Sequence, residues 1–469
     1  MLVFTYFMIK KISPFLHFCL LLIFFGCNNN EISKTYFGGQ IINPKTNHVI
    51  LFERETAIDT FYLSDNNRFL AEFDSKKEGL YYFKHDNEFQ YIYLEPKDSL
   101  QIRLNTLNFD ESLVFSGKGA ERNNFLIDCF IDSEKENKNF YDYYSLKPTQ
   151  FLKIIDSLET VKIKKYNDFS SRNDNETEEC MTFLNIALTY PLYSKIENYP
   201  LNHARILRND SFPKTNENFY KHREKVNLNK ESLIYFGVYS NFITNLLYNK
   251  TYASGFEPSV RDYSPEFTKT LLEITNTNIE AETTKNILLK QEVKYHFFKN
   301  SESTIDQEVF DTYFSLNTNK DFETQIKNLV SDTKYNNINS LITDFTVFDY
   351  TNIAHNIKDI IDKKNTVIYF WNPKHISEDF ISSKVNYLSS KNENVQFIGV
   401  KIDGNNESHI EKLDIKNQYF INSTSDANVF LSSKLPRVIL LDKTGRITNG
   451  YASISSKKIY YQVKELNKN

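Results

Sequence analysis

Cysteine is the residue type in this chain that could carry out thiol redox chemistry, and it occurs four times, at positions 19, 27, 129 and 180. Thiol–disulfide exchange needs a thiolate that attacks a disulfide and a second thiol that resolves the mixed disulfide. No two of these cysteines have the Cys-x-x-Cys spacing, and residues 342–469 contain none. Composition therefore excludes a dithiol mechanism in the C-terminal part of the chain.

Cys129 and Cys180 remain as a pair once the N-terminal segment is set aside. An exported protein can keep disulfides, so the two could be bonded. A thiol–disulfide oxidoreductase that works through them is one functional alternative. They could equally be two small buried side chains, which is a common role of free cysteine. Sequence spacing does not distinguish these alternatives.

His375 and Glu378 are a second pair of residues that could carry out chemistry. Three positions apart, they would share a helix face and could hold a metal ion or act as a base and its partner. No third ligand is apparent, and His355 and His409 are the nearest histidines in the sequence. The alternative is a surface histidine and a glutamate that interacts favourably with the helix dipole. We expect the second arrangement, and so no catalytic residue, metal or cofactor.

Strands and helices alternate around this pair. The β-branched and aromatic run Thr366–Phe370 predicts a strand, and a link containing Pro373 leads to a helix from Ser377. An α/β crossover, an antiparallel hairpin and a last helix would follow, which defines a C-terminal domain over residues 342–469. The remaining elements are expected at Val395–Ile402, Glu407–Leu413, Gln418–Ile421, Asn428–Ser433, Arg437–Leu441, Arg446–Tyr451 and Ser456–Leu466.

Three motifs of this domain resemble the TlpA/ResA group of thioredoxin-like proteins. Phe370-Trp371 resembles the pair that precedes the active site in that group. The segment Phe397–Asp403 resembles its second strand, and Leu435–Gly445 resembles its cis-proline strand and hairpin. Pro436 stands at the position of the cis-proline. The resemblance implies a thioredoxin-like α/β fold for about the last quarter of the chain.

The resemblance also locates the positions of the missing thiols. In the redox members, two cysteines follow the tryptophan by four and seven places, which here are His375 and Glu378. The Cys-x-x-Cys motif is therefore lost. A groove beside the cis-proline would remain and could hold an extended peptide. Its expected residues are Trp371, Asn372, Leu435 and Pro436.

The N-terminal residues look like an export signal. A basic pair at positions 10 and 11 precedes the apolar run Phe15–Phe25, which is short for a membrane span. The ending at Cys27 resembles a bacterial lipobox, which implies a signal peptide over residues 1–27 and a lipidated Cys27. By resemblance to sorting rules of diderm bacteria, Asn28 favours the outer membrane, and we expect the protein to face the periplasm. A plain cleaved signal or an uncleaved anchor is the alternative.

Residues 28–118 have the pattern of a β-rich domain. Short apolar runs alternate with clusters of turn residues, which is typical of a small sandwich or barrel. The closing motif Phe115–Ala120, followed by Asn123 and Asn124, resembles the β-domain of unknown function that often follows the anchor in periplasmic thioredoxin-like lipoproteins. We therefore expect a β-sandwich-like domain next to the membrane.

Residues 119–341 change to a helical period. Apolar residues recur three and four positions apart, and such stripes are more often core than a ligand groove. The stripes are Ile154, Leu158 and Val161; Tyr235, Tyr239, Phe242 and Leu246; and Leu289, Val293 and Phe297.

The composition is that of a folded α+β multidomain protein. The chain has 469 residues, of which 40% are hydrophobic and 25% charged, with a formal net charge of −4. No block of like charge suggests nucleic-acid binding. The prediction is a membrane-anchored envelope lipoprotein whose redox-inactive thioredoxin-like domain binds or scaffolds a peptide or protein client. An oxidoreductase using Cys129 and Cys180, or a metal or acid–base site at His375 and Glu378, is the alternative.

Overall fold

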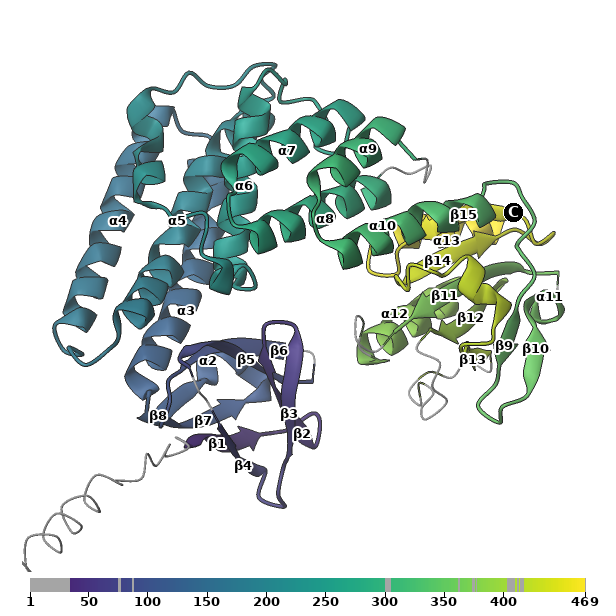
Figure 1. Cartoon of the computed structure of the whole chain (residues 1–469), viewed down its shortest axis with the longest axis horizontal. Helices are drawn as coiled ribbons and strands as arrows, with labels where there is room; N and C mark the ends of the chain where they lie inside the picture. The colour runs from purple at the N-terminus through teal and green to yellow at the C-terminus, as the bar shows by residue number, and fades with distance from the viewer. Residues whose placement is uncertain are drawn as a thin grey trace, which may run out of the picture.

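The computed structural model describes residues 34–74, 77–86, 88–299, 305–361, 363–372, 376, 378–402, 410, 413 and 417–468. In this part of the chain, two β-sheets come first, a helical region follows, and a mixed sheet flanked by helices ends the chain (Figure 1). This order confirms the expected α+β fold class. The predictions for Cys27, His375 and His409 lie outside the described residues.

Within the described residues, the N-terminal β-domain is a sandwich of two four-stranded sheets. Its strands are β1 (Lys34–Ile42), β2 (His48–Glu53), β3 (Thr56–Tyr62), β4 (Arg68–Asp74), β5 (Gly79–His85), β6 (Glu88–Leu94), β7 (Ser99–Asn105) and β8 (Val114–Lys118). One sheet has the order β4-β1-β7-β8 and the other β3-β2-β5-β6. Side chains from both sheets, such as Phe37, Phe83 and Leu100, share one core.

β1 is a central strand that the sequence pattern did not single out. It pairs with β4 in antiparallel and with β7 in parallel orientation. Gly38 and Gly39 weaken its strand signal, because glycine is depleted in strands. A Cβ atom on Gly39 would lie 2.1 Å from the carbonyl oxygen of Ile102 in β7. The close approach of these two strands therefore requires glycine.

The helical region follows β8 directly. Its main helices are α3 (Ala120–Tyr143), α4 (Pro148–Ser170), α5 (Glu178–Leu207), α6 (Gly237–Ala253), α7 (Pro265–Asn278), α8 (Glu282–Lys299), α9 (Gln307–Leu316) and α10 (Lys320–Asp332). The stripes of α6 and α8 are core, as predicted: Phe242 and Val293, for example, are 0% exposed. None of the described helices has the length and apolarity needed to cross a membrane.

The predicted buried face of α4 is wrong in part, because Leu158 packs against the core but Val161 does not. Val161 is 65% exposed, whereas Phe151 and Ile155 are buried. The ring of Phe151 packs against Tyr199 of α5, with ring centres 4.3 Å apart. This aromatic contact favours burial of the stripe that contains Phe151 and Ile155 over the stripe that contains Ile154 and Val161.

Glu292 of α8 is a buried carboxylate whose charge should oppose folding at neutral pH. The hydroxyl of Tyr248 donates a hydrogen bond to its Oε2 at 2.6 Å. Burial raises the pKa of Glu292 from 4.5 to about 7. An acid with a raised folded-state pKa contributes stability below its unfolded pKa, and this contribution is lost as the pH rises through the folded pKa. The cost above pH 7 is on the order of 3 kcal/mol.

We therefore expect Glu292→Gln to be more stable than the wild type at pH 8 and similar to it near pH 4.5. Glutamine keeps an acceptor for Tyr248 and carries no charge. Urea denaturation at the two pH values measures the difference. Glu273→Gln, at an exposed position on α7, is the matched control and should show little change. A stability difference for Glu292→Gln that does not depend on pH would contradict the assignment.

The C-terminal domain contains a seven-stranded sheet in the described residues. Its elements are β9 (Thr346–Phe348), β10 (Ala354–Asn356), α11 (Ile357–Ile360), β11 (Asn365–Trp371), α12 (Glu378–Lys391), β12 (Val395–Lys401), β13 (Gln418–Phe420), β14 (Arg437–Leu441), β15 (Ile447–Ala452) and α13 (Lys458–Lys468). The strand order is β10-β9-β13-β12-β11-β14-β15. β12 lies parallel to β11 and is reached through α12, while β14 pairs with β11 and β15 in antiparallel orientation. This is the thioredoxin-like arrangement.

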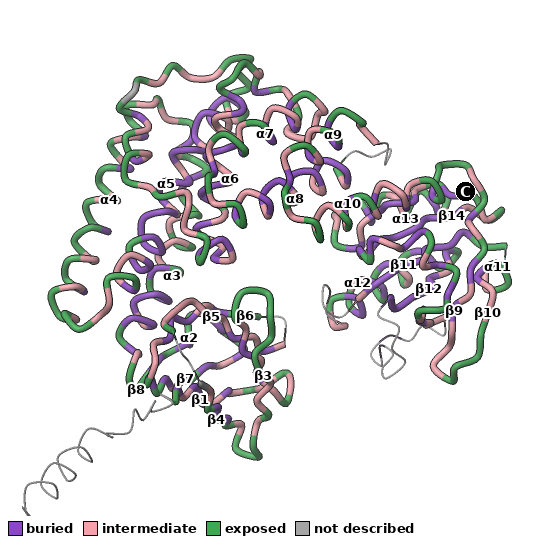
Figure 2. The backbone as a smooth tube through the Cα atoms, viewed as in Figure 1, coloured by how far each residue is buried: buried purple, intermediate pink, exposed green. Residues whose placement is uncertain are grey.

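Both faces of this sheet are covered. All residues of β11 are buried, and the buried strands run through the centre of the domain (Figure 2). Val367 and Tyr369 pack in the core shared with α12 and α13, and Ile368 and Phe370 pack in the opposite core. Gly445, in the hairpin between β14 and β15, has a φ of 79°, the left-handed conformation for which glycine is suited.

Candidate functional site

β11 and α12 frame the place where the resemblance expects an active site. Trp371 is 2% exposed and packs in the core beside α12. The next residue, Asn372, is half-buried, and its carbonyl oxygen accepts a hydrogen bond from the Ile376 amide at 3.1 Å. Glu378 begins α12, where a carboxylate interacts favourably with the helix dipole. Because His375 lies outside the described residues, the alternative of a metal or acid–base site at His375 and Glu378 is not tested.

The other histidines considered for a metal site do not add a described ligand. His409 lies outside the described residues. The Nε2 atom of His355, on β10, is 2.8 Å from Oδ2 of Asp349. Hydrogen bonds from Thr351 and then from His355 lower the pKa of Asp349. His355 is therefore engaged in a local hydrogen bond with Asp349.

The groove predicted beside Pro436 is partly closed. Leu435 is 6% exposed and packs in a core with helices of the helical region, including Leu329 of α10. Trp371 is also buried, so Asn372 and Pro436 are the half-exposed members of the predicted groove. No described peptide bond is cis, so the expected cis-proline is wrong. The trans form is the one that X–Pro bonds favour, by about 0.5 to 1 kcal/mol.

Asp332, at the end of α10, holds the loop that leads into β14. Its carboxylate accepts hydrogen bonds from Nη2 of Arg437 at 2.6 Å and from the hydroxyls of Ser432 and Ser433, both at 2.7 Å. The side chains of Asp332 and Arg437 are 0% and 1% exposed. Loss of either partner would leave an uncompensated buried charge, which is strongly destabilising. This contact therefore fixes the C-terminal domain to the helical region.

Cys129 and Cys180 are both buried and both free, so no disulfide joins them. Burial raises the pKa of the Cys129 thiol to about 12. Burial, together with the nearby carboxylate of Glu176, raises the pKa of Cys180 as well. The reactive species in disulfide exchange is the thiolate. The structure therefore contradicts the possible disulfide, and it favours the other alternative, two small buried side chains.

We expect Cys129 and Cys180 to react slowly with Ellman's reagent at pH 8 and rapidly after unfolding in urea. A chain carrying Cys19→Ser and Cys27→Ser isolates these two thiols. The physical reason is that burial disfavours the thiolate and blocks access of the reagent. Fast reaction of either thiol in the folded protein would contradict this prediction. Cys129→Ser and Cys180→Ser, made separately, show which of the two thiols reacts with the reagent.

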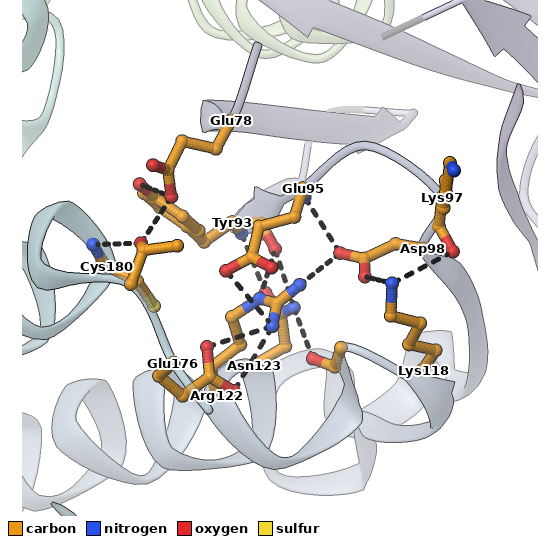
Figure 3. A network of polar contacts seen from close by, with 12 residues as sticks. Glu78, Tyr93, Glu95, Lys97, Asp98, Lys118, Arg122, Asn123, Glu176 and Cys180 are labelled. Carbon is orange, nitrogen blue, oxygen red and sulfur yellow. Dashed lines mark hydrogen bonds and ion pairs between the residues drawn. The ribbon is translucent and has the colours of Figure 1, made fainter. Parts of the chain in front are cut away.

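Arg122 of α3 is the centre of a buried ion-pair network between the β-domain and the helical region (Figure 3). Its Nη1 lies 2.9 Å from the Glu176 carboxylate and 3.5 Å from that of Glu95. Its Nη2 donates to Asp98. Burial opposes the charge, but Asp98 and Glu176 outweigh it and hold the pKa of Arg122 above its ordinary value. The Arg122 guanidinium therefore connects the turn after β6, which contains Glu95 and Asp98, with the loop before α5, which contains Glu176.

Glu95, Glu176 and Cys180 belong to this network and also meet a geometric condition for metal binding. One ligand atom from each lies within 4.8 Å of the others. A metal would need the Cys180 thiolate, which the raised pKa disfavours. Arg122 already supplies positive charge to both carboxylates. The ion-pair network therefore accounts for this cluster.

Asn123 and Asn124 attach the β-domain to α3. The amide of Asn123 accepts from the Tyr93 backbone N–H at 2.8 Å and donates to the Tyr93 carbonyl at 2.9 Å. Asn124 makes the same two bonds with Phe115 of β8, at 2.9 and 3.0 Å. A Cβ atom on Gly119 would lie 2.8 Å from the Asp98 carboxylate. The motif after β8 therefore has a structural role at this junction.

Comparisons with known proteins give matches only among solved structures. No protein-family model matches the chain, and no curated protein does. A candidate thiol-disulfide oxidoreductase from Bacteroides vulgatus is 24% identical, with 28% of this chain and 96% of that chain covered and a TM-score of 0.23. A candidate thiol:disulfide interchange protein DsbE from Chlorobium tepidum is 14% identical, with coverages of 28% and 98% and a TM-score of 0.24. The thioredoxin-like assignment of the C-terminal domain rests on its strand order.

Proposed function

We propose that this protein is a lipid-anchored envelope protein whose thioredoxin-like domain binds or scaffolds a peptide or protein client without thiol–disulfide exchange. One observation supports this most strongly. The C-terminal domain has the thioredoxin-like strand order, yet residues 342–469 contain no cysteine. The fold that would present a reactive thiol is kept, and the thiol is absent.

The client would contact the loop that leads into β14. It would bind on the side of this loop that does not contact the helical region. Leu435 and Arg437 face the helical region and are buried. Lys434 is exposed, and Asn372 and Pro436 are half-exposed. These three residues offer an ammonium, an amide and an apolar ring, a mixed surface suited to an extended peptide.

Site-specific photo-crosslinking tests this contact. A photoreactive residue at position 434 is expected to capture an envelope protein in cells, because Lys434 is exposed beside Pro436. The matched control is position 62, since Tyr62 is 70% exposed but lies in the β-domain. Capture by neither position, or equal capture of the same proteins by both, would count against the proposed contact.

The anchor is the second part of the proposal, and the basic pair, apolar run and Cys27 of the export signal support it. Cells fed with a labelled fatty acid should label the wild type and Cys19→Ser but not Cys27→Ser. Undiminished labelling of Cys27→Ser would refute lipidation at this residue.

An oxidoreductase that uses Cys129 and Cys180 is the weaker candidate. Both thiols are buried in the same core, outside the C-terminal domain, and have raised pKa values. Cys180 is 0% and Cys129 3% exposed, and the reactive thiolate is disfavoured at both.

A further inference from the structure

Residues of β6, α3, α5 and α6 line a cavity of about 670 Å³. Its described lining residues belong to the β-domain and to the helical region. This volume is within the range of small-molecule binding sites, roughly 300 to 1,000 Å³. The cavity is independent of the proposed client contact.

The wall formed by α5 offers hydrogen-bond acceptors without their usual donors. Pro191 lies inside this helix and has no N–H, so the Ala187 carbonyl lacks its helical donor. Both residues line the cavity. Ser194, one turn further along, is 9% exposed, and its hydroxyl hydrogen-bonds to none of the residues that the structure describes. The Ser194 oxygen is not among the fully enclosed atoms that lack a partner, so it stays open to a ligand or to water in the cavity.

The charges around the cavity are predominantly negative. Of the described residues that line it, Glu88, Asp110 and Glu134 are acidic and Lys195 is basic. Burial, followed by repulsion from neighbouring carboxylates, raises the pKa of Asp110, and Gln90 partly offsets this with a hydrogen bond at 2.9 Å. The Lys195 ammonium already donates to Asn137 and lies 5.2 Å from the centre of the Phe140 ring. The surplus of carboxylates favours a positively charged ligand.

Aromatic side chains line the cavity as well. Phe89 is 49% and Phe130 is 38% exposed, and both line the cavity together with Phe236 and Tyr91. The hydroxyl of Tyr91 accepts a hydrogen bond from the Gly237 amide at 3.1 Å, which holds β6 against the start of α6. Exposed rings can cover the apolar body of a ligand and attract a cation to their faces.

We propose that this cavity binds a small organic cation, an ammonium group carried on an apolar or aromatic body. The ammonium donates to the Ser194 hydroxyl and the Ala187 carbonyl, and the carboxylates of Asp110 and Glu134 balance its charge. The apolar body lies against Phe89 and Phe130. An anion bound by Lys195 is the opposite assignment, and the test distinguishes the two.

Phenethylamine is the probe, and isothermal titration calorimetry on the full chain is the measurement. We expect phenethylamine to bind at least tenfold more tightly than uncharged N-acetylphenethylamine, and 3-phenylpropionate not to bind. Glu134→Gln should weaken phenethylamine binding several-fold. Glu121→Gln, an exposed change on the same helix but outside the cavity, should leave it unchanged.

Each other outcome overturns the proposal. Absence of phenethylamine binding, or equal binding of the uncharged compound, removes the role of the ammonium. Tighter binding of 3-phenylpropionate assigns the cavity to anions instead. Equal effects of Glu134→Gln and Glu121→Gln place the binding site elsewhere. Because Glu134 is exposed, its substitution should not impair folding.

Discussion

Replacing Asp332 by alanine is expected to lower the free energy of unfolding by about 3 to 5 kcal/mol, because Arg437 would stay buried without its counter-charge. Ser432 and Ser433 would lose their acceptor in the same variant. Urea denaturation followed by tryptophan fluorescence measures the change. Trp371 is the only tryptophan and lies in the core of the C-terminal domain, so it reports on this domain.

Two further variants make the Asp332 result specific. Asp321→Ala changes an exposed aspartate at the start of the same helix and should cost less than about 1 kcal/mol. Asp332→Leu combined with Arg437→Met replaces the buried pair by apolar side chains and should recover most of the lost stability. If Asp332→Ala behaved like Asp321→Ala, the buried pair would not be what fixes the two parts together.

Arg122→Met is the second change with a large expected effect. It removes the one guanidinium that contacts Glu95, Asp98 and Glu176, and leaves buried carboxylates without a counter-charge. The expected loss in the free energy of unfolding is again about 3 to 5 kcal/mol. Limited proteolysis should show new cleavage around the β8–α3 junction, because the network ties the β-domain to the helices.

The pH dependence separates this charge effect from a simple packing defect. Burial raises the pKa of Glu95, and Arg122 partly offsets this, so the removal of Arg122 should raise it further. A raised carboxylate pKa favours the folded state at low pH, and this contribution is lost as the pH rises. The deficit of Arg122→Met should therefore be larger at pH 7 than at pH 4. Lys118→Met is the control, because Lys118 is 57% exposed and lies 3.9 Å from Asp98, and it should cost less than about 1 kcal/mol. A pH-independent deficit would contradict the electrostatic account.

Local patterns predicted β11, β12 and β14 well, because each is an apolar run that is almost fully buried. β9 and β10 were missed, because each has three residues and is partly exposed. β1 escaped detection for a local reason as well, since Gly38 and Gly39 obscure its pattern. The face of α4 could not be chosen from sequence, because Ile154 and Phe151 belong to competing apolar stripes. Packing against Tyr199, far along the chain, makes that choice.

The two buried charge networks could not be predicted from sequence spacing. Arg437 pairs with a carboxylate 105 positions away, and Arg122 pairs with Glu176 at a separation of 54. Charged residues are usually exposed, so nothing in the local pattern marks these as interior. The motif at Asn123 and Asn124 predicted where the β-domain ends and the helices begin. It did not predict the hydrogen bonds that these two residues make there.

Thiol chemistry was the part of function that composition could address, since a domain without cysteine cannot perform dithiol exchange. The structure adds that Cys129 and Cys180 are buried and unbonded. The C-terminal domain thus has a thioredoxin-like fold, and Asp332 of the helical region binds the loop that leads into β14.

Reduction of insulin disulfides by the purified full chain, with dithiothreitol as the electron donor, tests the central claim most directly. We expect no rate above that of dithiothreitol alone. A catalysed rate that disappears in Cys129→Ser or Cys180→Ser would contradict the account, because it would show that the buried thiols carry out exchange.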